Sequence, residues 1–274
     1  MFIPSTTKSN MKLNSSSNAR VTLCTVVFAV ALFGFPSMAQ SDRAVAAPSP
    51  AEVADAPADV MLPAAPAPTS VRETASAFDA TSWTNVSVGG VDPKVFGIAL
   101  EAAAAAVERG DASNPGTLTV IDFSRPSTVK RMWVFDLRSR KLLFEEVVSH
   151  GRGSGRIMAT AFSNKPESFQ SSLGLYRTAE TYVGKHGYSL RLDGLEPGVN
   201  DRARERAIVM HGADYVDQRT AEAQGYLGRS LGCPALRPAV TRQLIEAVKD
   251  GGLLFAYYPD PQWLQSSRYV SVAP

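Results

Sequence analysis

The chain has 274 residues, of which 45% are hydrophobic and 20% are charged, and its formal net charge at pH 7 is +2. The first 39 residues hold three basic and no acidic residues, so the rest of the chain carries a net charge of about −1. This composition is that of a globular protein with an ordinary core. It excludes the dense Lys/Arg surface typical of nucleic-acid binding.

The N-terminus has the pattern of a secretory signal peptide. An apolar run at 21–35 follows the three basic residues, and small residues stand at Ser37 and Ala39. The pattern predicts a signal peptide over residues 1–39, cleaved after Ala39, and hence a periplasmic or secreted protein. A retained anchor is the alternative, although the run is shorter than the roughly 20 apolar residues of a membrane span. Cleavage would remove Cys24 and leave Cys233 alone, which excludes an intramolecular disulfide.

A linker is expected after the signal. The stretch APSPAEVADAPADVMLPAAPAPTS is dominated by Ala, Pro, Ser and Asp and has little aromatic or β-branched mass to bury. Such a composition predicts disorder, and we assign residues 40–90 to an Ala/Pro-rich linker. Residues 91–274 remain for a single folded domain, which is long enough to form a core of its own.

The domain is expected to open on a helix and continue mainly as strands. Asp92 can cap a helix, Pro93 suits its first turn, and the helical pattern ends at Gly110. The predicted strands span residues 117–123, 131–137, 142–150, 174–183, 187–195, 206–212 and 253–258, and a second helix spans 238–252. These elements predict a mainly β fold, either a sandwich or a partly closed barrel, with helical additions.

Cys233 and His211 are the candidates for chemistry. His211 ends a predicted strand, and Cys233 follows 22 positions later, ahead of a predicted helix whose dipole would favour a thiolate. A thiolate is a nucleophile, and an imidazole within reach can take the thiol proton and later return it. The N–H groups of Gly232 and Cys233 can face an oxyanion. An inert buried thiol is the alternative, because cysteine is among the most buried residue types.

Other chemistries lack their motifs. Three dispersed histidines and a single mature cysteine predict no zinc site, and the chain has neither a phosphate-binding P-loop nor a dinucleotide fingerprint. The glycine-rich GRGSG at 151–155 follows a strand and is interpreted as a loop. We therefore expect no metal and no cofactor.

The stretch HGADYVDQRTAEAQGYLGRSLGCPALRP resembles the signature of the YkuD-type L,D-transpeptidases of bacterial cell walls, in which His-Gly at a strand end precedes Ser/Thr-His-Gly-Cys. Here 18 residues separate His211 from Ser230. FSNKPESFQSSLGLYRTAETYVGKHGYSLRLDGLEPGVN and IVMHGADYV are similar to the divergent murein L,D-transpeptidase branch. The resemblance covers roughly residues 115 to 260.

The resemblance implies a β-rich domain that attacks peptidoglycan stem peptides through a cysteine acyl-enzyme and acts at the cell wall. It makes Cys233 the nucleophile and His211 the base. It makes the Gly212 carbonyl a candidate to orient the imidazole, and it implies that Ser230 and Gly232 shape the loop that presents the thiol.

Two positions depart from the family pattern. Leu231 stands where the family has histidine, and Ala235 stands where it has arginine, the nearest arginine being Arg237. His150 ends another predicted strand and could compensate, with a surface turn histidine as the alternative. The imidazole and guanidinium lost at 231 and 235 must be absent or supplied from elsewhere.

Two further residues are candidates for substrate contact. Arg229 can meet a substrate carboxylate as a planar fork, with a solvated loop arginine as the alternative. Tyr176 lies in the segment that faces the stem peptide in the family, with core packing as the alternative. His186 is expected only to be exposed in a turn.

Three other functions remain open. An L,D-carboxypeptidase or endopeptidase would use the same acyl-enzyme and let water resolve it. The departures at Leu231 and Ala235 also fit a cell-wall-binding module that has lost catalysis. A sortase-like peptidase is disfavoured by the short interval between His211 and Cys233.

Overall fold

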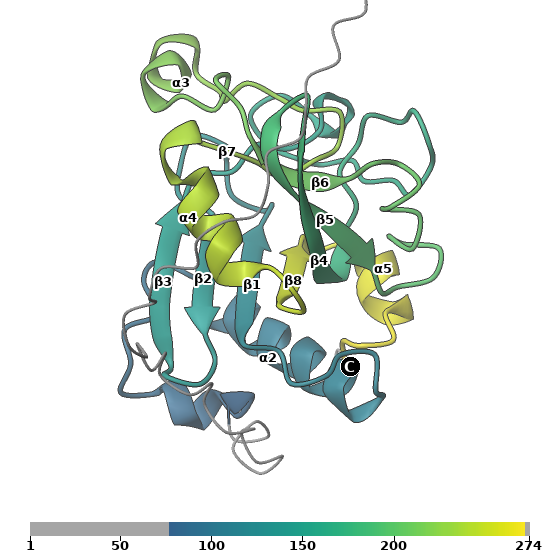
Figure 1. Ribbon diagram of the computed structural model, residues 1–274. Helices are drawn as coiled ribbons and strands as arrows, with labels where there is room; N and C mark the ends of the chain where they lie inside the picture. The colour runs from purple at the N-terminus through teal and green to yellow at the C-terminus, as the bar shows by residue number, and fades with distance from the viewer. Residues whose placement is uncertain (1–76, 272–274) are drawn as a thin grey trace, which may run out of the picture. The chain divides into compact units, whose positions relative to one another are not determined.

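The computed structural model describes residues 77–271 (Figure 1). The predicted signal peptide, and the predicted linker as far as residue 76, lie outside the described residues. Among those described, no helix combines the length and the hydrophobicity needed to cross a membrane.

One eight-stranded sheet organises the domain, in the order β3-β2-β1-β8-β4-β5-β6-β7. Its strands are β1 (Thr117–Asp122), β2 (Met132–Asp136), β3 (Lys141–Glu146), β4 (Gly174–Gly184), β5 (Gly187–Gly194), β6 (Val209–Gly212), β7 (Ala235–Leu236) and β8 (Leu253–Tyr257). The β1–β8 and β6–β7 pairs are parallel, and the other neighbours are antiparallel.

Backbone contacts bring the two edges of the sheet together. After β3 the chain runs beside β7, where the Ser149 N–H donates to the Ala235 carbonyl at 2.9 Å. Gly151 and Ser230 then form an isolated parallel bridge. The expected mainly β, partly closed barrel is therefore confirmed, because the segment that follows one edge strand closes onto the other.

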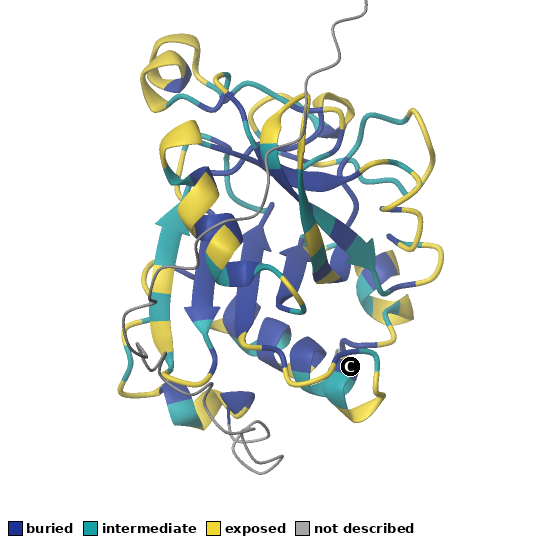
Figure 2. Cartoon of the chain, viewed as in Figure 1, coloured by how far each residue is buried: buried dark blue, intermediate teal, exposed yellow. Residues whose placement is uncertain are grey.

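Helices cover the central strands. Helix α2 (Pro93–Glu108) begins where the sequence predicts, with the Asp92 carboxylate accepting from the Lys94 and Val95 N–H groups. It contacts β1 and β8, whereas α4 (Pro238–Val248) contacts β1, β5 and β6. Every residue of β1 and β8 is buried (Figure 2), and because side chains alternate between the faces of a strand, both faces are covered there.

The folded part also includes elements that the sequence pattern did not predict. Residues 77–90 fall within the interval assigned to the linker, yet they form the 3-10 helix η1 (Ala80–Trp83) and pack Trp83 against Phe96. The other unpredicted elements are the two-residue β7, η2 (Arg152–Ser154), α3 (Gln218–Gln224) and α5 (Pro261–Ser266). All are short, and a few residues give too little periodicity to be recognised.

Candidate active site

His211 lies near the end of β6, between β5 and β7. It pairs with Ser189 of β5 in the antiparallel register and with Ala235 of β7 in the parallel register. Only 2% of His211 is exposed. Strands on both sides therefore fix the backbone from which the imidazole extends.

The backbone selects the tautomer of His211. Its Nδ1 lies 2.9 Å from the Gly212 carbonyl oxygen, and because a carbonyl only accepts, this nitrogen carries the proton in the neutral ring. Nε2 is left with a free lone pair, as a general base requires. Burial lowers the pKa of His211, and the Gly212 carbonyl partly opposes that effect. The imidazole is consequently neutral at pH 7.

A second histidine stacks on this imidazole. His186, in the turn between β4 and β5, lies with its ring centroid 4.4 Å from that of His211 and an interplanar angle of 29°. His186 is exposed, as the sequence predicts, but it also contributes to lowering the pKa of His211. The sequence pattern gives no signal of this contact, because 24 residues separate the two histidines.

Cys233 is the only cysteine among the described residues, and it is half-buried in the loop that leads into β7. Its Sγ accepts from the Val209 N–H at 3.5 Å, and its thiol donates to the Ala207 carbonyl at 3.6 Å. Burial raises the pKa of the thiol, and the Val209 N–H and the charge of Arg206 oppose this. At neutral pH the resting residue is thus a thiol.

The expected link between Cys233 and a helix dipole is wrong. Strand β7 separates Cys233 from α4, which begins at Pro238 and has Arg237 as its N-cap residue. The partial positive charge of a helix falls off within its first turn. The local help for a thiolate therefore comes from the Val209 N–H and from Arg206, not from α4.

The β6–β7 pairing relates the two candidate residues. His211 is opposite Ala235, and the Cys233 sulfur bonds to the backbone of Val209, two residues earlier on β6. Two residues along a parallel pair correspond to about 7 Å. His211, in β6, and Cys233, in the loop before β7, thus lie near each other.

Ser230 and Gly232 define the shape of the loop at residues 225–234, between α3 and β7, which carries Cys233 and is called the cysteine loop below. The Ser230 Oγ donates to the Cys233 carbonyl at 2.7 Å and accepts from the Gly232 N–H at 3.1 Å. Gly232 has φ +130°, and a Cβ there would lie 2.8 Å from both the Gln170 carbonyl oxygen and the Ile208 Cδ1. Only glycine fits this position. Because Ser230 already occupies the Gly232 N–H, the expectation that this group faces an oxyanion is wrong.

His150 is neither a surface histidine nor a group open to substrate. It is fully buried, with Nδ1 2.8 Å from the Arg131 Nη2 and Nε2 3.3 Å from the Gly155 carbonyl oxygen. Burial, followed by the charge of Arg131, lowers the pKa of His150 to about 3. The His150 backbone carbonyl accepts from the Ser230 N–H at 3.0 Å, so the backbone of His150 holds the cysteine loop in place.

The two proposed substrate contacts differ in accessibility. Tyr176 is 3% exposed, and its hydroxyl donates to the Ser172 carbonyl, so direct contact with a peptide is not available to it. Arg229 is half-buried, with Nη1 donating to the Gly155 carbonyl at 3.0 Å and its guanidinium 5.5 Å from the Tyr226 ring centroid. Arg229 remains a candidate for substrate contact, whereas Tyr176 is a core residue.

The positions that depart from the family pattern have clear environments. Leu231 is 57% exposed beside the cysteine, and Ala235 is fully buried. Arg237 forms a two-pronged ion pair with Glu146, with nitrogen–oxygen distances of 2.7 to 2.9 Å. Arg237 therefore connects the start of α4 to β3 and does not replace the missing arginine.

Two open pockets adjoin these segments. One has a volume of about 570 Å³ and is lined by Lys185, His186, Tyr188, Gly212, Ala213, Asp214, Tyr215, Pro238, Thr241 and Arg242. The other, of about 350 Å³, is lined by Arg152, Tyr215, Thr220, Gln224, Tyr226, Gly228 and Arg229. Tyr215, which lies in the chain between β6 and the cysteine loop, lines both pockets. Within residues 77–271 no group of three or more His, Cys, Asp or Glu side chains is arranged to hold a metal ion.

Comparisons with known proteins place the chain in a family. No functionally curated protein is significantly similar to it in sequence. Among solved structures, an L,D-transpeptidase from Mycobacterium smegmatis is 16% identical with a TM-score of 0.32, and the alignment covers 52% of this chain and 59% of that one. The chain thus spans about three fifths of the mycobacterial protein.

An L,D-transpeptidase from Stackebrandtia nassauensis is 13% identical with a TM-score of 0.32, and the alignment covers 69% of this chain and 91% of that one. The family model described as the L,D-transpeptidase catalytic domain matches residues 88–257, which is more than half of the chain. The chain belongs to the L,D-transpeptidase catalytic domain family.

Proposed function

We propose that this protein is a peptidoglycan L,D-transpeptidase that acts through an acyl-enzyme on Cys233, with His211 as the general base. The observation that carries the proposal is the arrangement around β6. His211 is held with its proton on Nδ1. The sulfur of Cys233, the only cysteine among the described residues, accepts from the N–H of Val209, which lies two residues before His211 on β6. Membership of the family supports the reaction class, and the local geometry supports the assignment of roles.

In the first half-reaction His211 Nε2 takes the thiol proton while Sγ attacks the carbonyl carbon of a stem-peptide amide. The S–C bond forms and the C–N bond breaks, and the departing amine takes the proton from the imidazolium. In the second half-reaction the amine of an acceptor stem attacks the thioester and gives its excess proton to His211. The new C–N bond forms, the C–S bond breaks, and the proton returns to the sulfur.

Hydrolysis is the second candidate function. Water in place of the acceptor amine would give an L,D-carboxypeptidase or endopeptidase with the same residues. The open pocket of about 570 Å³ beside Gly212 favours an acceptor as large as a peptide, although water can also enter it. A non-catalytic wall-binding module is the remaining alternative, and the exposed Leu231 and buried Ala235 motivate it.

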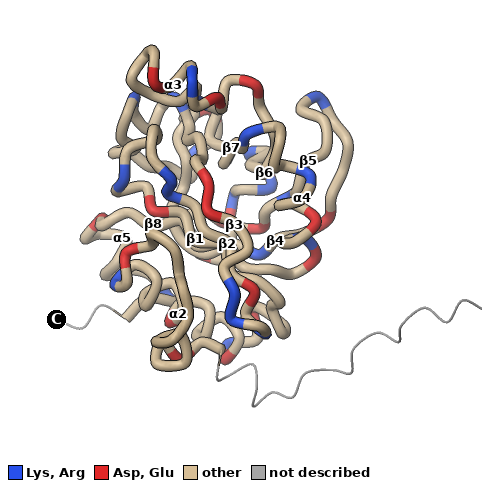
Figure 3. Tube along the Cα trace, turned by 90° about the vertical axis from the view of Figure 1, so that its left-hand side faces the viewer, with Lys and Arg blue, Asp and Glu red and all other residues tan. Residues whose placement is uncertain are grey.

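The site of action follows from the substrate. A peptidoglycan enzyme must work in the periplasm or at the cell wall, and the predicted signal peptide over residues 1–39 is consistent with that location. Lys and Arg are interspersed with Asp and Glu along the chain in the view of Figure 3. This mixed charge gives no support for a nucleic-acid partner.

Muropeptide analysis tests the proposal directly. Purified protein would be incubated with peptidoglycan fragments that carry tetrapeptide stems, and the products would be separated and weighed by mass spectrometry. We expect cross-linked dimers that lack one terminal residue, and none with Cys233→Ala. Shortened monomers alone would indicate the hydrolase, and unchanged stems would support the binding module.

A further inference from the structure

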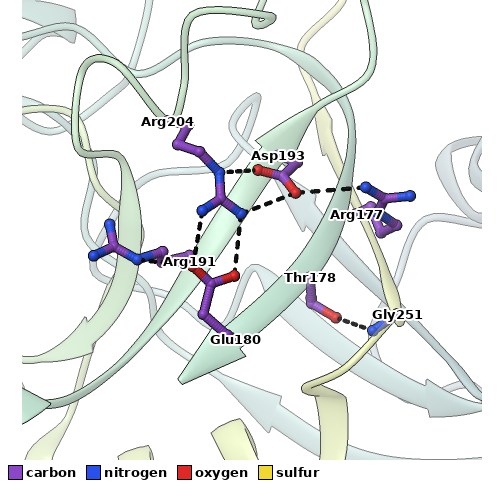
Figure 4. A network of polar contacts seen from close by, with 7 residues as sticks. All are labelled: Arg177, Thr178, Glu180, Arg191, Asp193, Arg204 and Gly251. Carbon is purple, nitrogen blue, oxygen red and sulfur yellow. Dashed lines mark hydrogen bonds and ion pairs between the residues drawn. The ribbon is translucent and has the colours of Figure 1, made fainter. Parts of the chain in front are cut away.

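Three arginines follow one another at alternate positions just before β6, and they differ in what neutralises them. Arg202 forms an i,i+3 ion pair with Glu205 at 2.7 Å. Arg204 bonds to Asp193 at 2.6 Å and to Glu180 at 2.8 Å, so it lies between two carboxylates (Figure 4). Each of these two guanidinium groups has a full negative charge beside it.

Arg206, the third, has no carboxylate partner among the described residues. Its Nη1 donates to the Ser163 carbonyl and the Ser172 Oγ, both at 2.6 Å, and its Nη2 donates to the Gln170 carbonyl at 2.6 Å and the Ser168 Oγ at 3.3 Å. All four acceptors are neutral oxygens. The guanidinium is held rigidly, yet its charge is not balanced.

The unbalanced charge faces the cysteine loop. The Arg206 Nη2 would lie 3.4 Å from a Cβ placed on Gly232, the residue before the cysteine. The Cys233 sulfur bonds to the Ala207 carbonyl and the Val209 N–H, which belong to the residues that follow Arg206 along the chain. Arg206 is half-buried, which lowers its pKa by desolvation and weakens the screening of its field by water.

The other ionisable groups near the sulfur do not supply a counter-ion. Burial raises the pKa of Tyr215 to about 12, with a smaller contribution from Cys233, and burial also raises the pKa of Tyr176. Both phenols are neutral at physiological pH. Burial lowers the pKa of His211, so it too is uncharged in the resting enzyme.

We propose that Arg206 is the electrostatic partner of Cys233, a fixed positive charge that becomes balanced only when the sulfur ionises. Arg206 acts through the cysteine and is a positioning residue for the reaction. Arg206, in the segment before β6, supplies a positive charge near the cysteine, whereas Leu231 and Ala235, at the family's His and Arg positions, are uncharged. The role of Arg206 in catalysis rests on the proposed function. Its effect on the ionisation of Cys233 can be measured without peptidoglycan.

The test is the pH dependence of Cys233 alkylation. The full chain would be treated with iodoacetamide from pH 6 to 12, and peptide mass spectrometry would distinguish Cys233 from Cys24. With Arg206→Gln the midpoint should rise by about one pH unit or more, because an opposite charge nearby lowers a pKa by one to three units. Arg206→Lys keeps the charge and should keep a midpoint near that of the wild type. Arg202→Gln, which removes a charge already paired with Glu205, is the matched control and should leave the midpoint unchanged.

A second pair of variants leaves Arg206 and its backbone contacts intact. Ser168→Asp places a carboxylate beside the guanidinium, and Ser168→Asn places a neutral group of the same size there. The midpoint should rise with Asp and not with Asn. This comparison decides the question even if Arg206→Gln does not fold.

An unchanged midpoint in a folded Arg206→Gln protein, equal midpoints in the two Ser168 variants, or the same rise in Arg206→Lys as in Arg206→Gln would each overturn the inference. Failure of the proposed function gives a different result, namely a shifted alkylation midpoint without any cross-linked product. Failure of the inference alone leaves the product and removes the shift.

Discussion

The Nδ1 atom of His211 lies 2.9 Å from the carbonyl oxygen of Gly212, and this contact determines which ring nitrogen is available for chemistry. Because the carbonyl holds the Nδ1 proton, Nε2 is the basic atom of the neutral ring. A backbone acceptor cannot move without moving β6. The tautomer is therefore a property of the sheet and not of a mobile side chain.

The first prediction concerns this ring. His211→Asn should lower the rate of thioester formation by about 10²- to 10⁴-fold, the usual contribution of a general base, because Asn cannot take up the thiol proton. The rate would be measured by rapid mixing with a stem peptide, and circular dichroism would confirm that the variant is folded. A variant rate within a factor of three of the wild type would contradict the assigned role.

The second prediction concerns the acid side of the pH–rate profile. Burial and the stacked His186 lower the pKa of His211, so the base stays unprotonated and active below pH 6.5. His186→Ala removes the like charge and should move the acid limb of kcat/KM to higher pH. His186→Lys, which keeps a positive charge there, should move it less. A limb that does not move with His186→Ala would mean that burial alone sets the pKa.

The third prediction concerns acid stability. The pKa of His150 is about 3 in the folded protein and near 6.5 in the unfolded chain, so the unfolded state takes up this proton first as the pH falls. Between pH 6.5 and about 3, His150 should therefore lower the free energy of unfolding by about 1.4 kcal/mol per pH unit. His150→Asn keeps an acceptor for Arg131 but cannot titrate, and it should remove this part of the slope.

Urea titrations at pH 7, 5.5 and 4 would measure that slope. Equal slopes for wild type and His150→Asn would show that His150 takes up its proton at the same pH in the folded and unfolded states, which would contradict the lowered pKa.

The fourth prediction concerns Gly232. Gly232→Ala should lower activity by at least tenfold, because the new Cβ would lie 2.8 Å from the Gln170 carbonyl oxygen and displace the cysteine loop. The cost in unfolding free energy should be about 1 to 3 kcal/mol, the range for strained backbone. Gly198→Ala is the matched control, since Gly198 also has a positive φ (+77°) but has no atom within 4 Å of the added Cβ. Equal activity in the two variants would contradict the importance of the loop's shape.

Much of the fold could be predicted from residue types and helix-capping signals. Seven of the eight strands lie where runs of β-branched and aromatic residues predict them, and the helix Pro93–Glu108 begins where Asp92 and Pro93 predict it. The two-residue β7 could not be predicted, since its pairing depends on β6 and on the chain after β3. Trp83 falls within the predicted linker, because the first helix signal in the sequence comes only at Asp92, and its packing against Phe96 and Phe135 exists only in the folded chain.

The candidate site was predicted less completely. The resemblance to the L,D-transpeptidases singles out His211 and Cys233 and implies that the Gly212 carbonyl orients the imidazole, which the structure bears out for the contact between Nδ1 and that carbonyl. The sequence does not single out Arg206. Its guanidinium is surrounded by neutral oxygens and has no carboxylate partner among the described residues, which only the folded arrangement shows. The burial of His150 could not be predicted from the sequence either, because its hydrogen-bond partner Arg131 lies 19 positions earlier in the chain.

The central claim is that Cys233 forms a covalent acyl-enzyme, and intact-protein mass spectrometry after incubation with a carbapenem tests it most directly. We predict a stoichiometric mass increase equal to one whole carbapenem molecule, because opening of the β-lactam ring releases no leaving group; the adduct should lie on the Cys233 peptide and be abolished in Cys233→Ala. A folded wild-type protein that gains no mass, or one whose adduct persists in Cys233→Ala, would contradict the account.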